Sequence, residues 1–433
     1  MFFTRKKDYK EWLSKFYEYG LIACILFLAL WLRKSLLPFI SGDMVNFYLP
    51  WYNFILSHGG SHAFKFDFAV LNVPYLYLYA IATHFPFSAP TNIKLLSIAF
   101  DMVLAGFTYL IVKEKYGRTF VPFVAVCIIL FLPSVFINSS LWGESDSSYV
   151  ALSLGAIYFL VSRRYFWSFV FWGLAISIKF QAIFVFPVLL TVFLSGEVPL
   201  LYFLIIPTVY LIALIPAIIE GRSFIDLLLI YTSETNATHC LTLNAPNMYQ
   251  WFGSGCFYNE QLKQGGIIFT LALILIVSLL VLRSRQKLTP VRIIRLSLLF
   301  SLLLPFFLPM MHERYFYLAD VLSVVYAFYV PKRFYVAIIV QLTSFLSYMP
   351  FLFGGPNHFH APSIVLSYVA FAPLLAMIVV ARDLIVDLYL SEPQITDQQG
   401  LFTGQSELAA TGDEEFVDKA SSLVKRESSE IHS

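Results

Sequence analysis

Charged residues are scarce in this sequence. Asp, Glu, Lys and Arg together make up 13% of the 433 residues, whereas a soluble globular domain carries about a quarter. Hydrophobic residues reach 59%, and the mean hydropathy is +0.74. Apolar stretches close to the ~20 residues that cross a bilayer as a helix recur along the whole chain. The composition excludes a soluble domain and predicts an all-α polytopic membrane protein.

Cysteine is also scarce, and no metal-ligand spacing is present. Cys24 and Cys127 lie in apolar stretches, and Cys240 and Cys256 share one polar loop. That pair can form a disulfide in an oxidising compartment, and two free thiols fit the sequence equally well. The net charge of +2 gives no indication of a nucleic-acid partner. The first apolar segment is not followed by a small-residue cleavage site, so we interpret it as a retained helix.

Clusters of Lys and Arg predict which loops are cytoplasmic, because basic residues concentrate on that side. The clusters lie at Arg5 to Lys7, Lys113 to Arg118, Arg163 and Arg164, Arg283 to Arg295, and Lys332 and Arg333. The connections that are poor in basic residues are predicted to lie outside: 41–91, 138–147, 219–263 and 353–362. We interpret 1–390 as the transmembrane domain and the acidic segment 391–433 as a disordered cytoplasmic tail.

The stretch 166–195 decides how these loops alternate. If the chain reverses near Lys179, two helices of about a dozen residues form a hairpin, which is tolerated where protein surrounds it. The loop 219–263 then lies outside, and the protein has about twelve helices with both termini in the cytoplasm. One long crossing would instead place 219–263 inside. We favour the hairpin because acidic residues outnumber basic ones in that loop.

Ionisable residues gather on the predicted outer side. His312, Glu313 and Arg314 interrupt an apolar run, and ionisable groups at membrane depth are costly enough to indicate function. Further polar candidates follow the ends of other predicted helices: Asp43, Glu144, Asp146, Lys179, Gln181, Asn244 and Asn247. Lys179, His312 and Arg314 run against the positive-inside trend, so they predict a bound anion.

Several of these residues also have a structural explanation. Asp43 could cap the helix that begins near Val45. Glu144 and Asp146 could be caps at the N-terminus of the next helix, where the helix dipole favours negative charge. Arg314 could form a structural ion pair with its neighbour in sequence. The functional interpretation therefore depends on the convergence of the candidates.

Other features of the sequence also have a structural interpretation. The stretch 44–91 mixes apolar and polar residues at helical spacing and is broken by prolines, so it predicts amphipathic helices in the outer interface. Lys179 could extend toward the interface, although apolar segments flank it on both sides. We interpret Asp101 and Asp320 as packing contacts between helices.

Four motifs resemble those of the GT-C superfamily of membrane glycosyltransferases, in particular bacterial relatives of the GPI-anchor second mannosyltransferase. Trp142–Ser147 resembles their Trp-Gly-Gln-x-Asp-Ser element, and Lys179–Gln181 resembles their Lys-x-Gln element. Asn244–Tyr249 is similar to Asn-x-x-Asn-Leu-Trp/Tyr, and Met311–Tyr315 to Met-His-Glu-Arg-Tyr. The motifs follow the same order from about residue 40 to about 330. One departure is Glu144, where the family has Gln.

The resemblance implies a GT-C-type bundle and a reaction. Such enzymes transfer a sugar from a polyprenyl-phosphate carrier to an acceptor on the non-cytoplasmic face, usually with inversion, and use a carboxylate of the first outer loop. By that pattern Asp43 is the expected base, Arg314, His312 and Lys179 bind the donor phosphate, and the sugar and acceptor contact Glu144, Asp146, Gln181, Asn244 and Asn247.

We expect the transferred sugar to be a hexose such as mannose and the acceptor to be a glycan or glycolipid. We expect the protein to contact membrane lipids and to lie in a bacterial plasma membrane. Asp43 has no second carboxylate one or two residues away, so we expect no metal and no other cofactor. A transporter of lipid-linked sugars is the alternative, but it predicts an internal repeat, and the large first outer loop has no counterpart in the second half of the chain.

Overall fold

The structure is a computed structural model that describes residues 2–236, 239–253, 256–353 and 363–390. Met1–Leu388 form one compact unit. The predicted tail 391–433 and most of the predicted outer loop 353–362 lie outside the described residues.

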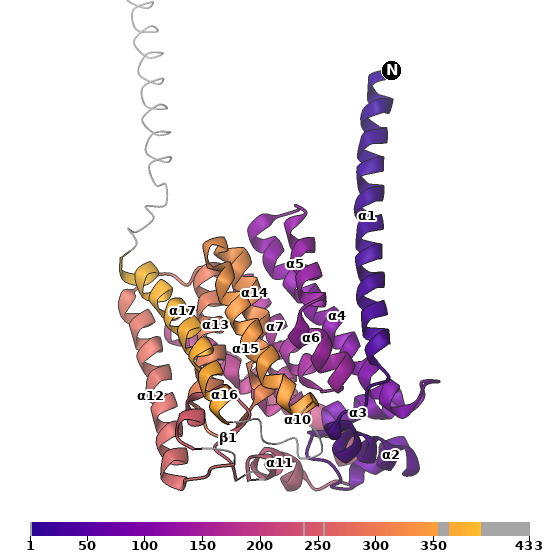
Figure 1. Cartoon of the computed structure of the whole chain (residues 1–433), viewed down its shortest axis with the longest axis vertical. Helices are drawn as coiled ribbons and strands as arrows, with labels where there is room; N and C mark the ends of the chain where they lie inside the picture. The colour runs from indigo at the N-terminus through magenta and orange to yellow at the C-terminus, as the bar shows by residue number, and fades with distance from the viewer. Residues whose placement is uncertain (1, 237–238, 254–255, 354–362, 391–433) are drawn as a thin grey trace, which may run out of the picture. The chain divides into compact units, whose positions relative to one another are not determined.

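Helices make up nearly all of the first half of the described chain (Figure 1). Their bounds are α1 (Phe2–Leu36), η1 (Met44–Tyr48), α2 (Leu49–Ser57), η2 (Gly60–Lys65), α3 (Val73–Ala82), α4 (Ala89–Tyr116), α5 (Val121–Leu130), α6 (Pro133–Phe136), η3 (Ile137–Trp142), α7 (Asp146–Val161), α8 (Tyr165–Ile178), η4 (Phe180–Val185), α9 (Phe186–Leu194), η5 (Leu200–Leu204) and α10 (Ile205–Ile219). The elements η1 and η3 are π-helices, and η2, η4 and η5 are 3₁₀-helices.

The second half adds two very short strands. Its elements are α11 (Phe224–Asn236), β1 (Thr242–Leu243), η6 (Met248–Trp251), α12 (Glu260–Ser284), α13 (Pro290–Phe307), β2 (Met311–His312), η7 (Glu313–Phe316), α14 (Tyr317–Tyr329), η8 (Pro331–Arg333), α15 (Phe334–Phe353), α16 (Ser363–Val369) and α17 (Phe371–Tyr389). In the described residues β1 and β2 form a parallel pair, with Leu243 opposite His312.

Seven helical segments of the described residues are long and apolar enough to cross a membrane. They are Phe16–Leu36, Ala89–Tyr116, Leu200–Ile219, Glu260–Ser284, Pro290–Phe307, Pro331–Phe353 and Val365–Tyr389. The pair Val121–Leu130 and Pro133–Trp142, bent by 47°, makes an eighth if it is one span. The protein is therefore an all-α polytopic membrane protein, as its composition predicts, and the total of about twelve helices stays a prediction.

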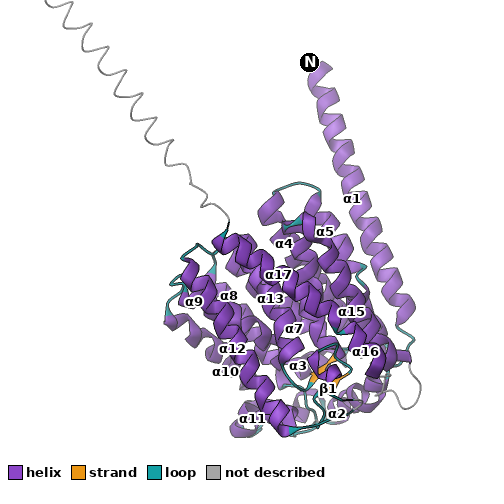
Figure 2. Cartoon of the chain, turned by 60° about the vertical axis from the view of Figure 1, so that its left-hand side comes forward, coloured by secondary structure: helices purple, strands orange, loops and turns teal. Residues whose placement is uncertain are grey.

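The chain reverses between α8 and α9. Arg163, just before α8, forms an ion pair with Glu197, just after α9. The hydroxyl of Tyr165 donates to the same carboxylate at 2.6 Å. The two ends of this stretch therefore lie side by side, as a hairpin requires and a single crossing does not allow (Figure 2).

The predicted cytoplasmic basic residues meet at the same ends of several helices. Arg163 also donates to the backbone carbonyl of Leu288. Lys115, in the last turn of α4, donates to the carbonyl of Tyr329 at 2.7 Å, at the end of α14. Arg333 pairs with Asp383 of α17 at 2.6 Å. These contacts connect the ends of several helices on the predicted cytoplasmic side of the bundle.

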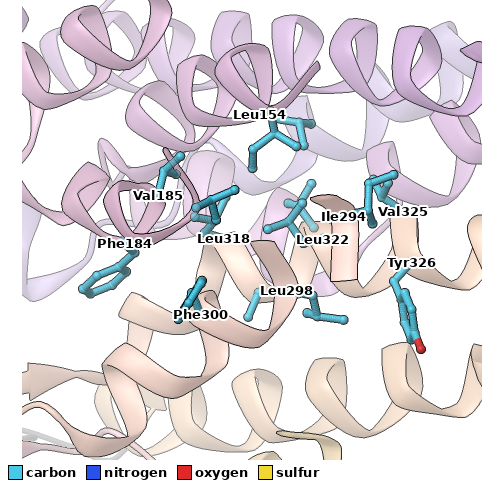
Figure 3. Close-up of a cluster of buried hydrophobic side chains, with 14 of the residues drawn as sticks. Leu154, Phe184, Val185, Ile294, Leu298, Phe300, Leu318, Leu322, Val325 and Tyr326 are labelled. Carbon is cyan, nitrogen blue, oxygen red and sulfur yellow. The ribbon is translucent and has the colours of Figure 1, made fainter. Parts of the chain in front are cut away.

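The centre of the bundle is formed by α13 and α14, whose side chains are buried on nearly every face. Figure 3 shows part of this packing, where Leu298 and Leu322 lie among side chains from α7 and η4. Because lipid is as apolar as leucine, close packing and internal polar contacts hold such helices together.

Two buried carboxylates contribute polar contacts of this kind. Asp101 of α4 pairs with Arg33 of α1, with Nη2 of the arginine 2.9 Å from Oδ2 of the aspartate. Asp320 of α14 accepts a hydrogen bond from Ser344 of α15 at 2.7 Å. Both contacts join different helices, which confirms the packing interpretation of Asp101 and Asp320.

The two large loops at the other end of the bundle contact each other. The elements α2, α3, α11 and β1 lie at this end (Figure 1). Arg222 pairs with Asp67, and Nδ1 of His62 lies 2.8 Å from Oε2 of Glu220. The predicted helices of the first loop are present as η1, α2, η2 and α3.

The second loop is tied to the segment that precedes α14. Cys240 and Cys256 form a disulfide, which the sequence alone does not decide. Next to it, the amide of Met310 donates to the carbonyl of Leu241 at 2.7 Å, and the β1–β2 pairing follows. The loop 219–263 thereby positions the chain just before Glu313.

Candidate functional site

The candidate site lies where four breaks between helices meet. Asp43 follows α1, Glu144 lies between η3 and α7, Lys179 lies between α8 and η4, and Arg314 lies in η7 before α14. A break between helices frees the backbone to aim a side chain inward. Lys179, for example, has an extended backbone (φ −150°, ψ 135°) between two helices.

A glycine permits the sharpest of these breaks. The π-helix η3 ends at Trp142, and Gly143 follows with φ at 86°, in the left-handed region that L residues avoid. A Cβ at this position would lie 2.5 Å from the side chain of Met44. Gly143 thus lets the chain turn closely past η1 and directs Glu144 and Asp146 toward the same interior.

Arg314 is the centre of the cluster. Its Nε lies 3.4 Å from Oε2 of Glu144 and 3.6 Å from Oδ2 of Asp146. Its Nη1 lies 3.2 Å from Oε1 of Glu313 and 3.8 Å from Oδ2 of Asp43. One guanidinium therefore faces four carboxylates, and the ion pair with Glu313 is only one of its contacts.

Lys179 is held by the same carboxylates. Its Nζ pairs with Oδ1 of Asp146 and lies 4.0 Å from Oε2 of Glu144. It also donates to Oγ of Ser145 at 3.4 Å. The ammonium group is thus directed into the protein and does not extend toward the interface.

Asp43 does not cap the following helix. Its side chain makes no capping hydrogen bond to η1, and Oδ2 instead accepts a hydrogen bond from Nε1 of Trp142 at 3.0 Å. The Asp43 side chain is 12% exposed and that of Arg314 14%, whereas Glu144 and Asp146 are fully buried. Asp43 and Arg314 are therefore the members of this cluster that a substrate can reach most directly.

The buried carboxylates are held by neutral donors as well as by cations. The hydroxyl of Tyr48 donates to Oε2 of Glu144 at 2.5 Å, and Nδ2 of Asn138 donates to Oδ2 of Asp146 at 3.0 Å. Asp146 lies in the first turn of α7, as the structural interpretation expects, and Ser145 is the N-cap and makes no side-chain capping hydrogen bond.

The electrostatics of the site favour neutral forms of two groups beside Arg314. Burial lowers the pKa of His312 well below its usual value, and Arg314 and Lys179 lower it further. His312 is therefore neutral at neutral pH, and the positive charge is on Lys179 and Arg314. Burial raises the pKa of the Glu313 carboxyl to about 7, against the opposing effect of Arg314.

The pKa of Glu144 is also raised. Burial is the main cause, and Arg314 opposes it, while the nearby charge of Asp43 adds to it. A carboxyl here is thus more easily protonated than in water.

The remaining candidates are Asn244, Asn247 and Gln181. Asn244 has a left-handed backbone (φ 56°). It forms an antiparallel β-bridge with His312 through the backbone, so it lies beside the His312–Arg314 segment. Asn247 is buried, and its Oδ1 accepts from the amide of Tyr249 at 3.2 Å, which caps η6. Gln181 is buried in η4, which packs against α7 and α13.

The structure adds residues to which the sequence alone assigns no role. In the sequence Trp142 is only part of a motif, Tyr48 only part of an amphipathic stretch, and Asn138 only part of a loop. Their contacts to Asp43, Glu144 and Asp146 join elements far apart in sequence. Of these three residues, only Trp142 could have been singled out from the sequence, because it belongs to one of the four motifs.

In the described part of the chain, no group of three or more His, Cys, Asp or Glu side chains could hold a metal ion. Arg314 occupies the position between the carboxylates. Independence from metal stays a prediction.

Comparison of the sequence with profiles of protein families and with curated proteins gave no match. The resemblance to glycosyltransferase motifs therefore stays an expectation from the sequence.

Proposed function

We propose that the protein is a GT-C-type membrane glycosyltransferase that moves a hexose, with mannose the first choice, from a polyprenyl-phosphate carrier to an acceptor glycan or glycolipid. The observation that carries the proposal is the contact of Arg314 with Asp43 inside a buried charged cluster. A base for the acceptor and a cation for the leaving phosphate are the two groups that this transfer requires.

In the proposed reaction, the acceptor hydroxyl oxygen attacks the anomeric carbon of the donor sugar, and Asp43 accepts the hydroxyl proton. The new bond forms as the bond between the anomeric carbon and the phosphate oxygen breaks. Polyprenyl phosphate leaves with the electron pair, and attack from the opposite face inverts the configuration.

The leaving phosphate is stabilised by Arg314 and Lys179. An arginine matches the geometry of a phosphate with two parallel donors, and a lysine contributes a point charge. In a site from which most water is excluded, this stabilisation is worth more than in water. His312, being neutral, contributes a hydrogen bond and no charge.

Glu144 and Asp146 receive a different role from the one that the sequence suggests. Both are fully buried and contact the two cations, which supports a role in holding Arg314 and Lys179 in place. Gln181, Asn244 and Asn247 stay candidates for contact with sugar or acceptor hydroxyls.

The proposed topology has about twelve membrane helices, both termini in the cytoplasm and the site at the outer face of a bacterial plasma membrane. The separation of the basic loop ends from the Asp43 cluster supports this orientation. The disulfide between Cys240 and Cys256 also supports an oxidising side for the second loop.

The deciding experiment measures sugar transfer by the purified protein in liposomes supplied with polyprenyl-phosphate mannose and an acceptor glycolipid. Asp43→Asn should lower kcat by about 10²- to 10⁴-fold, because the base is lost. Asp67→Asn is the matched control, since Asp67 is an exposed carboxylate of the same outer loop, and it should keep wild-type activity.

Full activity of Asp43→Asn would overturn the assignment of the base. A wild-type protein that moves the lipid-linked sugar across the bilayer without transferring it would overturn the enzymatic proposal in favour of a transporter.

A further inference from the structure

We propose that Trp142 is a positioning residue that aligns Asp43 with Arg314. The inference rests on the proposed transfer reaction and assigns Trp142 a role that acts through the Asp43 carboxylate. Three contacts of the Trp142 residue carry the argument: one from its indole N–H, one from its ring face and one from its backbone carbonyl.

The indole contacts the base and the cation together. Nε1 donates to Oδ2 of Asp43 at 3.0 Å, and the guanidinium carbon of Arg314 lies 5.5 Å from the centre of the Trp142 ring. The Nη1 of Arg314 lies 3.8 Å from the same Oδ2. Trp142, Asp43 and Arg314 thus form a closed triangle of contacts.

The backbone of Trp142 holds the Asp43 segment from a second side. The carbonyl of Trp142 accepts a hydrogen bond from Oγ of Ser41 at 2.8 Å. The same Oγ accepts from the amide of Met44 at 3.1 Å. One residue therefore fixes both the main chain around Asp43 and the direction of its carboxylate.

The ring itself has little freedom to move. Trp142 is fully buried, with Phe351 stacked at 4.8 Å between ring centres and Tyr348 edge-on at 5.4 Å. Both aromatic residues belong to α15. A rigid donor that holds one carboxylate oxygen presents the other in a fixed direction, which is the pre-organisation that efficient proton transfer requires.

The sharpest test replaces Trp142 by benzothienylalanine, which keeps the bicyclic shape and replaces the N–H by sulfur. The hydrogen bond to a charged acceptor is then lost while the packing stays. We expect kcat to fall about 10- to 100-fold, with the KM for the polyprenyl-phosphate donor nearly unchanged because the ring still faces Arg314. Trp142→Leu removes the ring as well, so it should also raise the donor KM.

A double-mutant cycle separates positioning from a general structural effect. If Trp142 acts through the Asp43 carboxylate, the benzothienylalanine replacement should have little further effect in the Asp43→Asn background. Trp172 is the matched control, because it is a buried tryptophan whose Nε1 donates to a backbone carbonyl, that of Ala182, at 2.7 Å. Its replacement should act independently of Asp43.

Wild-type kcat after the Trp142 replacement, or an equal loss of kcat in both backgrounds, would overturn the inference while the transfer reaction stands. Absence of transfer by the wild-type protein would overturn both.

Discussion

Nη1 of Arg314 lies 3.8 Å from Oδ2 of Asp43, although the two residues come from opposite halves of the chain. The same guanidinium reaches Glu144 at 3.4 Å and Asp146 at 3.6 Å. It therefore connects the segment after α1 with the start of α7 and with the turn before α14. This connection makes Arg314 the residue whose replacement tests the site most directly.

The first prediction concerns Arg314 and the donor. Arg314→Ala should raise the KM for the polyprenyl-phosphate donor more than that for the acceptor, because the phosphate loses its bidentate partner. Arg314→Lys should restore only part of the donor affinity, since an ammonium cannot face several oxygens in the same planar way. The measurement is steady-state transfer with each substrate varied in turn.

Arg222→Lys is the control for this series. Arg222 is also a buried arginine paired with a carboxylate at the same end of the bundle, but it does not belong to the cluster. A similar rise of donor KM in Arg222→Lys, or a change of the acceptor KM alone in Arg314→Ala, would count against the phosphate assignment.

The second prediction concerns pH and Glu313. Burial raises the pKa of this carboxyl from 4.5 to about 7. A group with a raised folded-state pKa stabilises the fold below its unfolded value, and this contribution is lost as pH rises through the folded value. The wild-type protein should therefore lose stability through Glu313 between about pH 4.5 and 7, by about 1.4 kcal/mol for each pH unit in that interval.

Glu313→Gln cannot titrate, so its melting temperature relative to the wild type should rise from about pH 5 to about pH 8. Glu260→Gln is the control, because Glu260 is an exposed carboxylate outside the buried cluster. Thermal unfolding in detergent at several pH values gives the answer, and parallel pH curves for wild type and Glu313→Gln would contradict the prediction.

Much of the fold could be predicted from the sequence, because long apolar helices and basic loop ends follow from composition alone. The reversal at Lys179 was also predictable, since only a hairpin there places the acidic loop 219–263 on the side opposite the basic clusters. The pairing of Cys240 with Cys256 was not, because proximity in one loop does not determine the redox state.

The sequence names the residues of the candidate cluster, but it does not give their contacts. The motifs indicated Lys179 and Arg314, and the place in the first predicted outer loop indicated Asp43, whereas the role of Glu144 depends on which groups surround it. Its burial and its contacts with Tyr48 and Arg314 come from elements that no sequence periodicity relates. The neutral state of His312 likewise follows from neighbours that only the folded chain brings together.

The third prediction concerns the ion pair between Arg33 and Asp101. Both side chains are buried, with Nη2 and Oδ2 2.9 Å apart. Asp101→Leu should destabilise the protein by about 3–5 kcal/mol, because it leaves a buried arginine without its counter-ion. The double variant Arg33→Met with Asp101→Leu should recover most of the loss, since two packed apolar side chains need no compensation.

The measurement is the shift of the thermal unfolding midpoint in detergent for both single variants and the double variant. A double variant as unstable as the sum of the single variants would show that the two side chains act independently.

The fourth prediction concerns the orientation in the membrane. Asp226, in α11, and Lys287, between α12 and α13, are both exposed. In a chain with Cys24 and Cys127 replaced by Ser, Asp226→Cys should react with a membrane-impermeant maleimide in intact cells. Lys287→Cys should react only after the membrane is opened. Labelling in the reverse order would place the Asp43 cluster on the cytoplasmic side.

The four carboxyl groups around Arg314 have a consequence for turnover. When the sugar has left, polyprenyl phosphate carries an additional negative charge beside Asp43 and Asp146. Repulsion between the spent carrier and these carboxylates favours its release, so the acidic surroundings of Arg314 promote product dissociation in the proposed cycle.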